Sequence, residues 1–270
     1  MDIAYSGGPD STALMVLATA AGLDITAHHV HHGLRDDADR DVELARAIAN
    51  RLGARFVEHR VTIEPGPNLE ARARAARSRV LPTGSLTGHT ADDQAETVLL
   101  RLLRGSGADG LAAMEPGPSH PILSLRRSET VAVCAEMGLE VAEDATNADP
   151  AHQRNRIRHE GLPLLNDIAR RDLVPVLVRT ADVLRDDAVF LDELAGELDP
   201  TDARMLAAAP VALARRAIRR WLTLEGYPPD TAAVERVLDV ARGARVACEI
   251  TGGRRISRSG QLLEITPIQR

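Results

Sequence analysis

Short apolar segments alternate with longer amphipathic segments along the first half of the chain. The short segments predict strands at residues 2–6, 24–30 and 54–61, and residues 85–88 are a further short strand candidate. Apolar residues at helical spacing predict the helices between and after them, at residues 10–21, 39–52, 69–80 and 91–104. Repeats of this kind predict an α/β fold, with a parallel sheet of about five strands covered by helices.

The pattern becomes mainly helical after the Pro- and Gly-rich residues 115–121. We expect a helix at residues 128–137 and a polar loop at 143–158. Helical chain is expected at 162–198 and a linker at 199–202, and two further helices at 210–225 and 231–242. Three short strands follow at residues 246–250, 254–258 and 262–265. We therefore expect a Rossmann-like catalytic domain with a trailing linker helix over residues 1–195, and a small C-terminal α/β domain over residues 196–270.

Arginine supplies every basic side chain, because the chain has 33 basic residues and no lysine. Enzymes that form a Schiff base through lysine, NTPases with a Walker A lysine and protein kinases are therefore excluded. A bound phosphate must be held by backbone N–H groups, by Arg or through a metal ion. A coding bias toward Arg is the simplest cause of this composition.

Acidic and basic residues are unevenly distributed, although the net charge is only −6. Residues 1–150 contain 14 Arg and 22 acidic residues, whereas residues 151–270 contain 19 Arg and 17 acidic residues. This asymmetry is compatible with a polyanionic partner on the second part, and it does not require one.

Neither a leader sequence nor a membrane span is expected, because no charged and apolar segment opens the chain and no apolar run approaches 18 residues. We therefore expect a cytoplasmic protein without membrane contact. Cys134 and Cys248 lie far apart, which argues against a disulfide framework and against a cysteine metal site. The oligomeric state is left open, with a homodimer as one arrangement.

A glycine-rich loop joins the first predicted strand to the first predicted helix and consists of Ser6, Gly7, Gly8, Pro9, Asp10 and Ser11. The glycines let the backbone approach an anion, and N–H groups of the first helical turn point toward it. The serines add hydroxyl donors, and Asp10 can hold Mg²⁺ against phosphates. The loop therefore predicts a site for a phosphate group and Mg²⁺; the alternative is a strand–helix turn without a ligand.

This hexapeptide resembles the PP-loop of the N-type ATP pyrophosphatases, which cleave ATP to AMP and pyrophosphate. Four further segments resemble those of the tRNA(Ile)-lysidine synthetases, in the same order along the chain. They are residues 29–35 (HVHHGLR), Glu70 with Ala73, Arg74 and Arg77, residues 88–97 (GHTADDQAET) running on to 104–107 and 110–111, and residues 143–147 (EDATN) with 154–158 (RNRIR). The resemblance covers residues 6–163, and no motif extends beyond about residue 165.

The resemblance implies that ATP adenylates the wobble cytidine of an isoleucine tRNA and that the ε-amine of free L-lysine then displaces AMP. It places ATP at residues 6–11 with His29, and Mg²⁺ at Asp10. The catalytic residues that it implies are Asp10, His89, Asp93, Glu96, Arg74 and Arg77. The lysine and tRNA contacts that it implies are Asp93, Glu96, Asp144, Asn147, Arg154, Asn155 and Arg158.

Simpler structural interpretations remain for several of these residues. Asp92, Asp93 and Glu96 open a predicted helix, where acidic side chains interact favourably with the helix dipole. A solvated loop is the alternative to an RNA or pyrophosphate contact at residues 154–158. Zinc is the alternative ligand for the histidines near residue 29, although no neighbouring Cys or carboxylate completes a familiar ligand set.

Three positions depart from the pattern of the family: Ser78 replaces a usual Tyr, Thr90 replaces a frequent His, and His120 replaces the Arg of an Arg-Pro-Leu-Leu segment. These changes bear on substrate contacts rather than on the class of reaction. A tRNA thiolase, or another PP-loop ligase on the same scaffold, is the alternative function. The thiolases typically need paired cysteines or an iron–sulfur cluster, and here the two cysteines are single.

Overall fold

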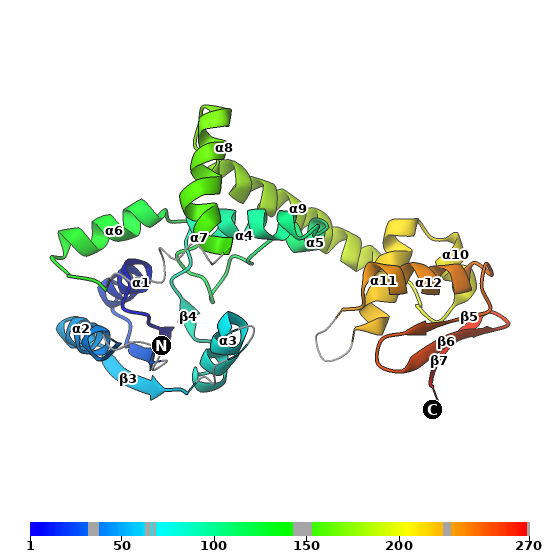
Figure 1. Cartoon of the computed structure of the whole chain (residues 1–270), viewed down its shortest axis with the longest axis horizontal. Coiled ribbons are helices and arrows are strands. Elements are labelled where there is room, and N and C mark those ends of the chain that lie inside the picture. Colours follow the sequence, from blue (N-terminus) through cyan, green and yellow to red (C-terminus); the bar gives the residue numbers. More distant parts are fainter. Residues whose placement is uncertain (32–37, 63–65, 67–68, 143–152, 224–227, 269–270) are drawn as a thin grey trace. The chain divides into compact units, whose positions relative to one another are not determined.

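The computed structural model describes residues 1–31, 38–62, 66, 69–142, 153–223 and 228–268 (Figure 1). The chain forms two compact units, Met1–Asp182 and Val183–Arg270, which we call unit 1 and unit 2. The boundary between the units falls within α9 (Val174–Gly196). The predicted domain boundary after residue 195 lies at the end of the same helix and stays a prediction.

A parallel sheet forms the centre of unit 1, with the strand order β3-β2-β1-β4. The strands are β1 (Asp2–Ala4), β2 (Thr26–His31), β3 (Arg55–Arg60) and β4 (Leu86–Thr87). The described residues therefore contain four parallel strands, where about five were expected. Ala4 at the end of β1 pairs with His28 on one side and Thr87 on the other. The loops that follow β1 and β4 consequently leave the sheet side by side, at the edge where open α/β sheets bind ligands.

Helices α1 (Pro9–Ala20), α2 (Ala38–Arg51), α3 (Leu69–Val80), α4 (Ala91–Leu103), α5 (Ala108–Leu111) and α6 (Arg127–Glu136) complete the αβ part of unit 1. Small apolar residues fill much of its core, which includes the fully buried Ile3, Met15 and Ala27. Helix α6 lies along α1 (Figure 1). This contact places the start of α6 beside the loop that follows β1.

The prediction of a polar loop at residues 143–158 is wrong for its described part. Residues 153–156 form α7 (Gln153–Arg156), and a π-helical turn, η2 (Ile157–Gly161), continues into α8 (Leu162–Ala169). Polar side chains of this segment point into the protein: Asn155 is buried, and Arg154 and Arg158 bond to a carboxylate of α4. Apolar periodicity could not reveal a helix that is fixed in place by ion pairs.

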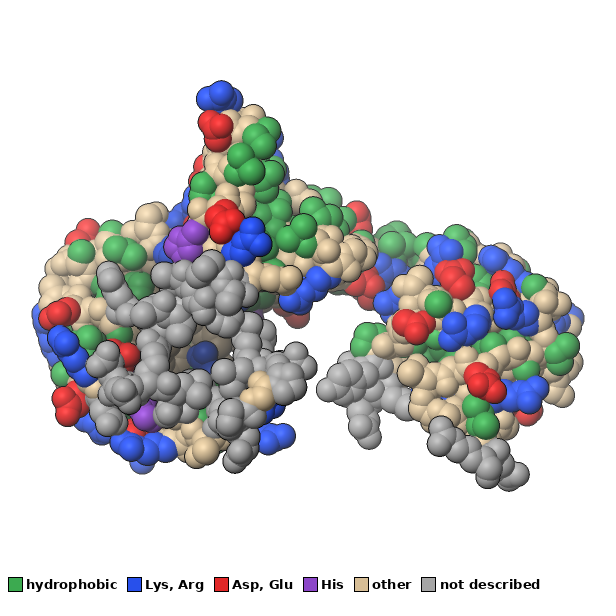
Figure 2. All heavy atoms as spheres, viewed as in Figure 1, with side chains coloured by type: hydrophobic (Ala, Val, Ile, Leu, Met, Phe, Trp, Pro, Cys, Tyr) green, Lys and Arg blue, Asp and Glu red, His purple; other side chains and the backbone are tan. Residues whose placement is uncertain are grey.

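The helical prediction over residues 162–198 is confirmed with one interruption. Helix α8 ends at Arg170, whose left-handed backbone conformation (φ 53°) stops the helix before α9 begins. Leu164 and Ile168 are exposed on α8, whose apolar side chains are visible in Figure 2. Within the described residues, no helix is long and apolar enough to cross a membrane.

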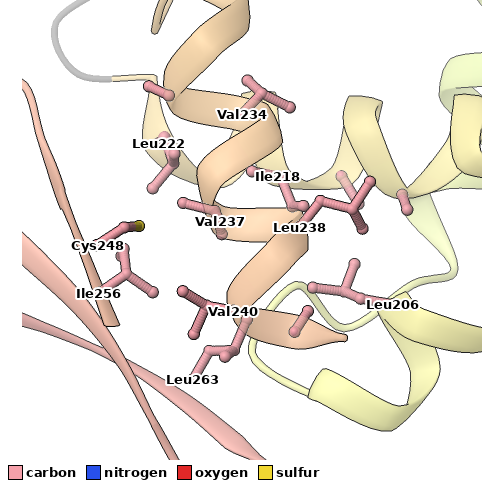
Figure 3. Close-up of a cluster of buried hydrophobic side chains, with 14 of the residues drawn as sticks. Leu206, Ile218, Leu222, Val234, Val237, Leu238, Val240, Cys248, Ile256 and Leu263 are labelled. Atoms are coloured by element: carbon pink, nitrogen blue, oxygen red, sulfur yellow. The ribbon is translucent and has the colours of Figure 1, made fainter. Parts of the chain in front are cut away.

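Unit 2 packs helices against an antiparallel sheet with the strand order β5-β6-β7. Its elements after α9 are α10 (Ala203–Ala208), α11 (Val211–Leu222), α12 (Thr231–Ala241), β5 (Ala247–Ile250), β6 (Arg254–Ser259) and β7 (Leu262–Pro267). Leu206, Ile218, Leu238, Ile256 and Leu263 meet in its core (Figure 3). The prediction of helices and strands in a small C-terminal domain is confirmed, while its start at residue 196 stays a prediction.

Candidate active site

The predicted phosphate loop leaves β1 and turns directly into α1. Gly7 adopts φ +85°, a conformation that favours glycine, and Gly8 and Pro9 are the N-cap and first residue of the helix. The backbone N–H of Ser6 donates to Ser11 Oγ at 3.2 Å, and this hydroxyl donates to the Gly8 carbonyl at 3.1 Å. The loop is thus closed on itself at the N-terminus of α1, where the helix dipole favours an anion.

The turn after β4 contacts the same helix. A Cβ atom at Gly88 would lie 2.7 Å from the carbonyl oxygen of Asp10, so only glycine allows this approach. His89 follows directly and leads into α4. Because β4 lies beside β1 in the sheet, the predicted loop and the predicted helix of residues 91–104 come together.

His89 lies beside a second imidazole at the end of β4. Its Nδ1 is 2.8 Å from Thr87 Oγ1, and the Nδ1 of His120 is 2.6 Å from the same hydroxyl. Burial lowers the pKa of His89 to about 4 and outweighs the opposing charge of Asp93, while nearby cations that include Arg77 lower it further. His89 is therefore neutral at pH 7 and serves as a hydrogen-bonding group.

Two carboxylates of α4 are buried at the base of this site. Asp93 Oδ2 accepts hydrogen bonds from the backbone N–H (2.9 Å) and hydroxyl (2.8 Å) of Thr90, so Asp93 also stabilises the helix start, through a capping box rather than through the helix dipole alone. Glu96 has no exposed surface and lies on the same helical face. The structure thus joins two of the predicted site residues.

Three arginines surround Glu96. Arg154 Nε and Arg158 Nε each lie 2.7 Å from a carboxylate oxygen of Glu96, and an Arg127 terminal nitrogen lies 3.0 Å away. The solvated-loop alternative for residues 154–158 does not match this arrangement, because Arg154 and Arg158 form ion pairs with Glu96, whereas the RNA or pyrophosphate contact stays a prediction. A fully buried carboxylate needs such partners, since desolvation of an unpaired charge is strongly unfavourable.

The two aspartates of the site respond differently to burial. Burial alone would raise the pKa of Asp93, but the charges of Arg127 and Arg154 and the bonds from Thr90 bring it below its usual value. Burial raises the pKa of Asp10, although hydrogen bonds from Thr130 and the charge of Arg127 oppose the increase. Asp93 is consequently held as an anion more firmly than Asp10.

The sequence did not reveal two residues that contact Asp10. Thr130 Oγ1 donates to Asp10 Oδ1, and Arg127 Nε approaches Asp10 Oδ2 at 3.4 Å. Both lie on α6, which the hydrophobic pattern predicted correctly but which carries none of the motifs above. An unexplained Arg at the start of a helix was the only available signal.

The histidines near residue 29 face opposite sides of the sheet. His29 donates through Nδ1 to the Tyr5 carbonyl at 3.1 Å and stacks on Phe56. On the other face, the ring nitrogens of His28 lie 2.8 Å from Asp2 Oδ1 and 2.9 Å from His59 Nε2. His29 therefore lies beside the residue that precedes the phosphate loop, where we expected a nucleotide contact.

Other expected residues are less completely described. Asp144 and Asn147 lie outside the described residues, as does the side chain of Arg74. Asn155 is buried in α7. Among the described side chains, no three His, Cys, Asp or Glu residues are arranged to hold a metal ion. The assignment of Mg²⁺ to Asp10 stays a prediction.

Two families of known proteins match separate parts of the chain. Residues 1–165 match the PP-loop domain family, and residues 202–263 match the TilS substrate binding domain family. A tRNA(Ile)-lysidine synthase of Nocardia farcinica is 42% identical over 253 residues, which cover 88% of this chain and 80% of the relative. The enzyme of the same name from Mycobacterium leprae is 44% identical over 239 residues, or 82% and 74% of the two chains.

A solved structure also shares the fold. It is the U34-tRNA thiolase NcsA from Methanococcus maripaludis with its [4Fe-4S] cluster, which has a TM-score of 0.51 and 15% identity. The match covers 68% of this chain and 71% of that chain, and it shows the fold alone. The sequence relatives and both matched domains, together with the site at the end of the parallel sheet, show that the chain belongs to the tRNA(Ile)-lysidine synthase family.

Proposed function

We propose that this protein ligates free L-lysine to the wobble cytidine of an isoleucine tRNA, with ATP converted to AMP and pyrophosphate. The observation that carries the proposal is the meeting of two predicted motifs in unit 1: the phosphate loop at α1 and the buried carboxylates at α4. One suits a polyphosphate, and the other suits an ammonium group. A ligase that joins an amine to an adenylated base needs both ends within one site.

In the first step, the loop N–H groups at residues 6–11 bind the phosphates of ATP, and Asp10 would hold Mg²⁺. Magnesium would neutralise part of the phosphate charge. The carbonyl oxygen of the cytidine attacks the α-phosphorus, and the bond to pyrophosphate breaks. His89, neutral at pH 7, offers a hydrogen bond close to the loop, and Arg77 contributes positive charge for the departing pyrophosphate.

In the second step, the ε-amine of lysine attacks the activated carbon of the base, and AMP leaves. The ammonium form binds at Asp93 and Glu96, whose oxygens already accept bonds from arginines. Lysine binding therefore requires one guanidinium, of Arg154 or Arg158, to withdraw from Glu96. The released arginine then becomes available to a phosphate of the tRNA or to pyrophosphate.

Proton transfer also belongs to this step, because only a neutral amine attacks. Of the two carboxylates, Asp93 retains 9% side-chain exposure and Glu96 none. We assign the proton to Asp93, from which it can pass to solvent. The low pKa of Asp93 makes this a transient role rather than a stable protonated state.

Unit 2 is the proposed tRNA-binding part. Residues 202–270 contain 12 Arg and 7 acidic residues, and four of these arginines lie on α11. Arg215 pairs with Glu235 at 2.5 Å and Arg216 with Asp192 at 2.6 Å, so part of this charge is already compensated within the unit. Basic and acidic side chains are interspersed on the face drawn in Figure 2. Phosphate binding would therefore involve exchange of ion-pair partners.

A labelling assay tests the function. The protein is incubated with ATP, labelled lysine and tRNA(Ile) transcripts that carry cytidine or uridine at the wobble position. Label in the cytidine transcript only, with one AMP and one pyrophosphate per lysine, is the expected result. Label absent from RNA while AMP accumulates on another acceptor would refute the proposal. Sulfur incorporated into the RNA would instead favour a thiolase, although the buried Cys134 and Cys248 belong to different units.

Variants of the loop test the site. Asp10→Ala removes the carboxylate proposed for Mg²⁺, and we expect loss of pyrophosphate release with the fold retained. Thr19→Ala, on the same helix, is the matched control. Full activity of Asp10→Ala would contradict the assignment.

A further inference from the structure

One guanidinium joins the two ends of the site. Arg127 donates through Nε to Asp10 at 3.4 Å and through its terminal nitrogens to Asp93 at 2.7 Å and Glu96 at 3.0 Å. Asp10 belongs to the helix that follows the phosphate loop, whereas Asp93 and Glu96 belong to α4. These acceptors use all three nitrogens of one planar group, so their relative positions are tied to its shape.

The backbone around Arg127 is fixed on both sides. Its N–H donates to Asp92 Oδ2 of α4 at 2.8 Å. One turn later Thr130 bonds to Asp10, and Cys134 Sγ lies 3.4 Å from the Pro9 carbonyl of α1. Helix α6 thus bridges α1 and α4 through its first two turns.

The bridging group stays charged despite its burial. The Arg127 side chain is 22% exposed. Burial alone would lower its pKa, but the carboxylates of Asp93 and Glu96 raise it above its usual value. A fixed cation among three carboxylates balances their repulsion while it spaces them.

We propose that Arg127 is a positioning residue, which holds Asp10 and the Asp93–Glu96 pair at the spacing that ligation requires. The inference rests on the proposed function, which assigns the adenylated base to the side of Asp10 and the lysine amine to the side of Asp93 and Glu96. Arg127 contacts neither the adenylated base nor the reacting nitrogen of lysine. Arg127 instead fixes the distance between Asp10 and the Asp93–Glu96 pair. In enzymes generally, misplacement of a reacting group by about 1 Å reduces the rate about 100-fold.

Substitutions of two adjacent arginines test the proposal in the full-length protein. For Arg127→Gln we expect kcat for lysidine formation to fall about 100-fold. The KM for lysine should not rise, because removal of a cation does not weaken the attraction of the carboxylates for an ammonium. Arg126→Gln is the control: Arg126 pairs with Asp92 and Asp172 instead, and kcat should stay within about threefold of the wild type.

A conservative variant separates geometry from charge. Arg127→Lys keeps the charge but cannot reach three carboxylates at once, so kcat should remain at least about tenfold below the wild type. Complete recovery in Arg127→Lys would overturn the proposal, because charge alone would then suffice. Equal losses in Arg127→Gln and Arg126→Gln would also overturn it, since both would then act through the stability of the helix start.

A stability measurement keeps this inference distinct from the proposed function. Urea midpoints are compared for Asp10→Asn, Glu96→Gln and the double variant, in the wild-type and Arg127→Gln backgrounds. With Arg127 present, we expect the shift of the double variant to differ from the sum of the two single-variant shifts. In the Arg127→Gln background, we expect it to equal that sum. If the wild type forms no lysidine, the proposed function fails while this cycle still decides whether the bridge exists. Additive shifts in the wild-type background would refute the bridge.

Discussion

His89 shows how burial sets the charge of one side chain in the site. Its pKa is lowered from 6.5 to about 4, so the unfolded chain binds a proton more tightly than the folded chain. The stabilisation from neutral His89 is therefore complete above pH 6.5 and is lost as the pH falls toward 4. We expect a loss of up to about 3 kcal/mol in the free energy of unfolding.

Urea unfolding at pH 7 and pH 4.5 checks this expectation. The wild type should lose more stability between these values than His89→Gln, which has no imidazole to protonate. An equal loss in both proteins would show that His89 is not buried in its neutral form.

Gly88 sets the contact between β4 and α1. A methyl group there would lie 2.7 Å from the Asp10 carbonyl, which must move to admit it. We expect Gly88→Ala to destabilise unit 1 by about 1–3 kcal/mol and to reduce activity through displacement of the loop. Gly161→Ala is the control, because its Cβ would meet nothing closer than 3.8 Å and its backbone is helical. Unchanged urea midpoints in both variants would contradict the steric argument.

The residue identities in the site were only partly accessible from the sequence. Asp10, Asp93 and Glu96 lie within motifs whose local spacing predicts a loop or one helical face. Arg127 and Thr130 carry no such signal, because their partner Asp10 is 117 and 120 residues away. Their roles depend on the packing of α6 on α1.

Among the elements, several helices with an apolar face were predicted within one or two residues, whereas α7 and α10 were not predicted as helices. The predicted helix at residues 69–80 matches α3, and that at 231–242 matches α12 with one extra residue. Residues 153–156 have mainly polar side chains, and ion pairs with α4 replace the apolar contacts that create a periodic pattern. A prediction from hydrophobic periodicity therefore fails where polar contacts hold a helix.

The N-terminal cap of α12 provides a test of how a single helix end contributes to stability. Asp230 Oδ1 accepts the Ala233 N–H at 2.6 Å and so caps the helix. We expect Asp230→Ala to reduce the stability of unit 2 by about 1 kcal/mol, and Asp230→Asn to reduce it much less because Asn also caps. Urea unfolding followed by Trp221 fluorescence measures both. Equal losses would attribute the effect to charge rather than to capping.

Across the whole molecule, each unit has a hydrophobic core of its own. The cluster around Ile218 and Leu238 belongs to unit 2, and the cluster around Ile3 and Met15 belongs to unit 1. Trp221, the single tryptophan, packs against the first of these clusters. Its fluorescence consequently reports on unit 2, whereas circular dichroism reports on both units.

We therefore expect two separable unfolding transitions. Gly88→Ala should lower the transition seen by circular dichroism without moving the Trp221 midpoint, and Asp230→Ala should move the Trp221 midpoint. A common shift of both signals in both variants would mean that the units unfold as one.

Residues close together in the chain specify the alternation of strands and helices, the phosphate loop and the acidic helix face, so all three could be predicted before the structure was known. The composition also shows that the chain has no lysine, so a phosphate bound to it would be held by backbone N–H groups, by Arg or through a metal ion. Tertiary structure decided which arginines meet Glu96: Arg127, Arg154 and Arg158 are separated from it by 31, 58 and 62 residues. A buried carboxylate must find partners wherever the fold supplies them, and no local pattern specifies that choice.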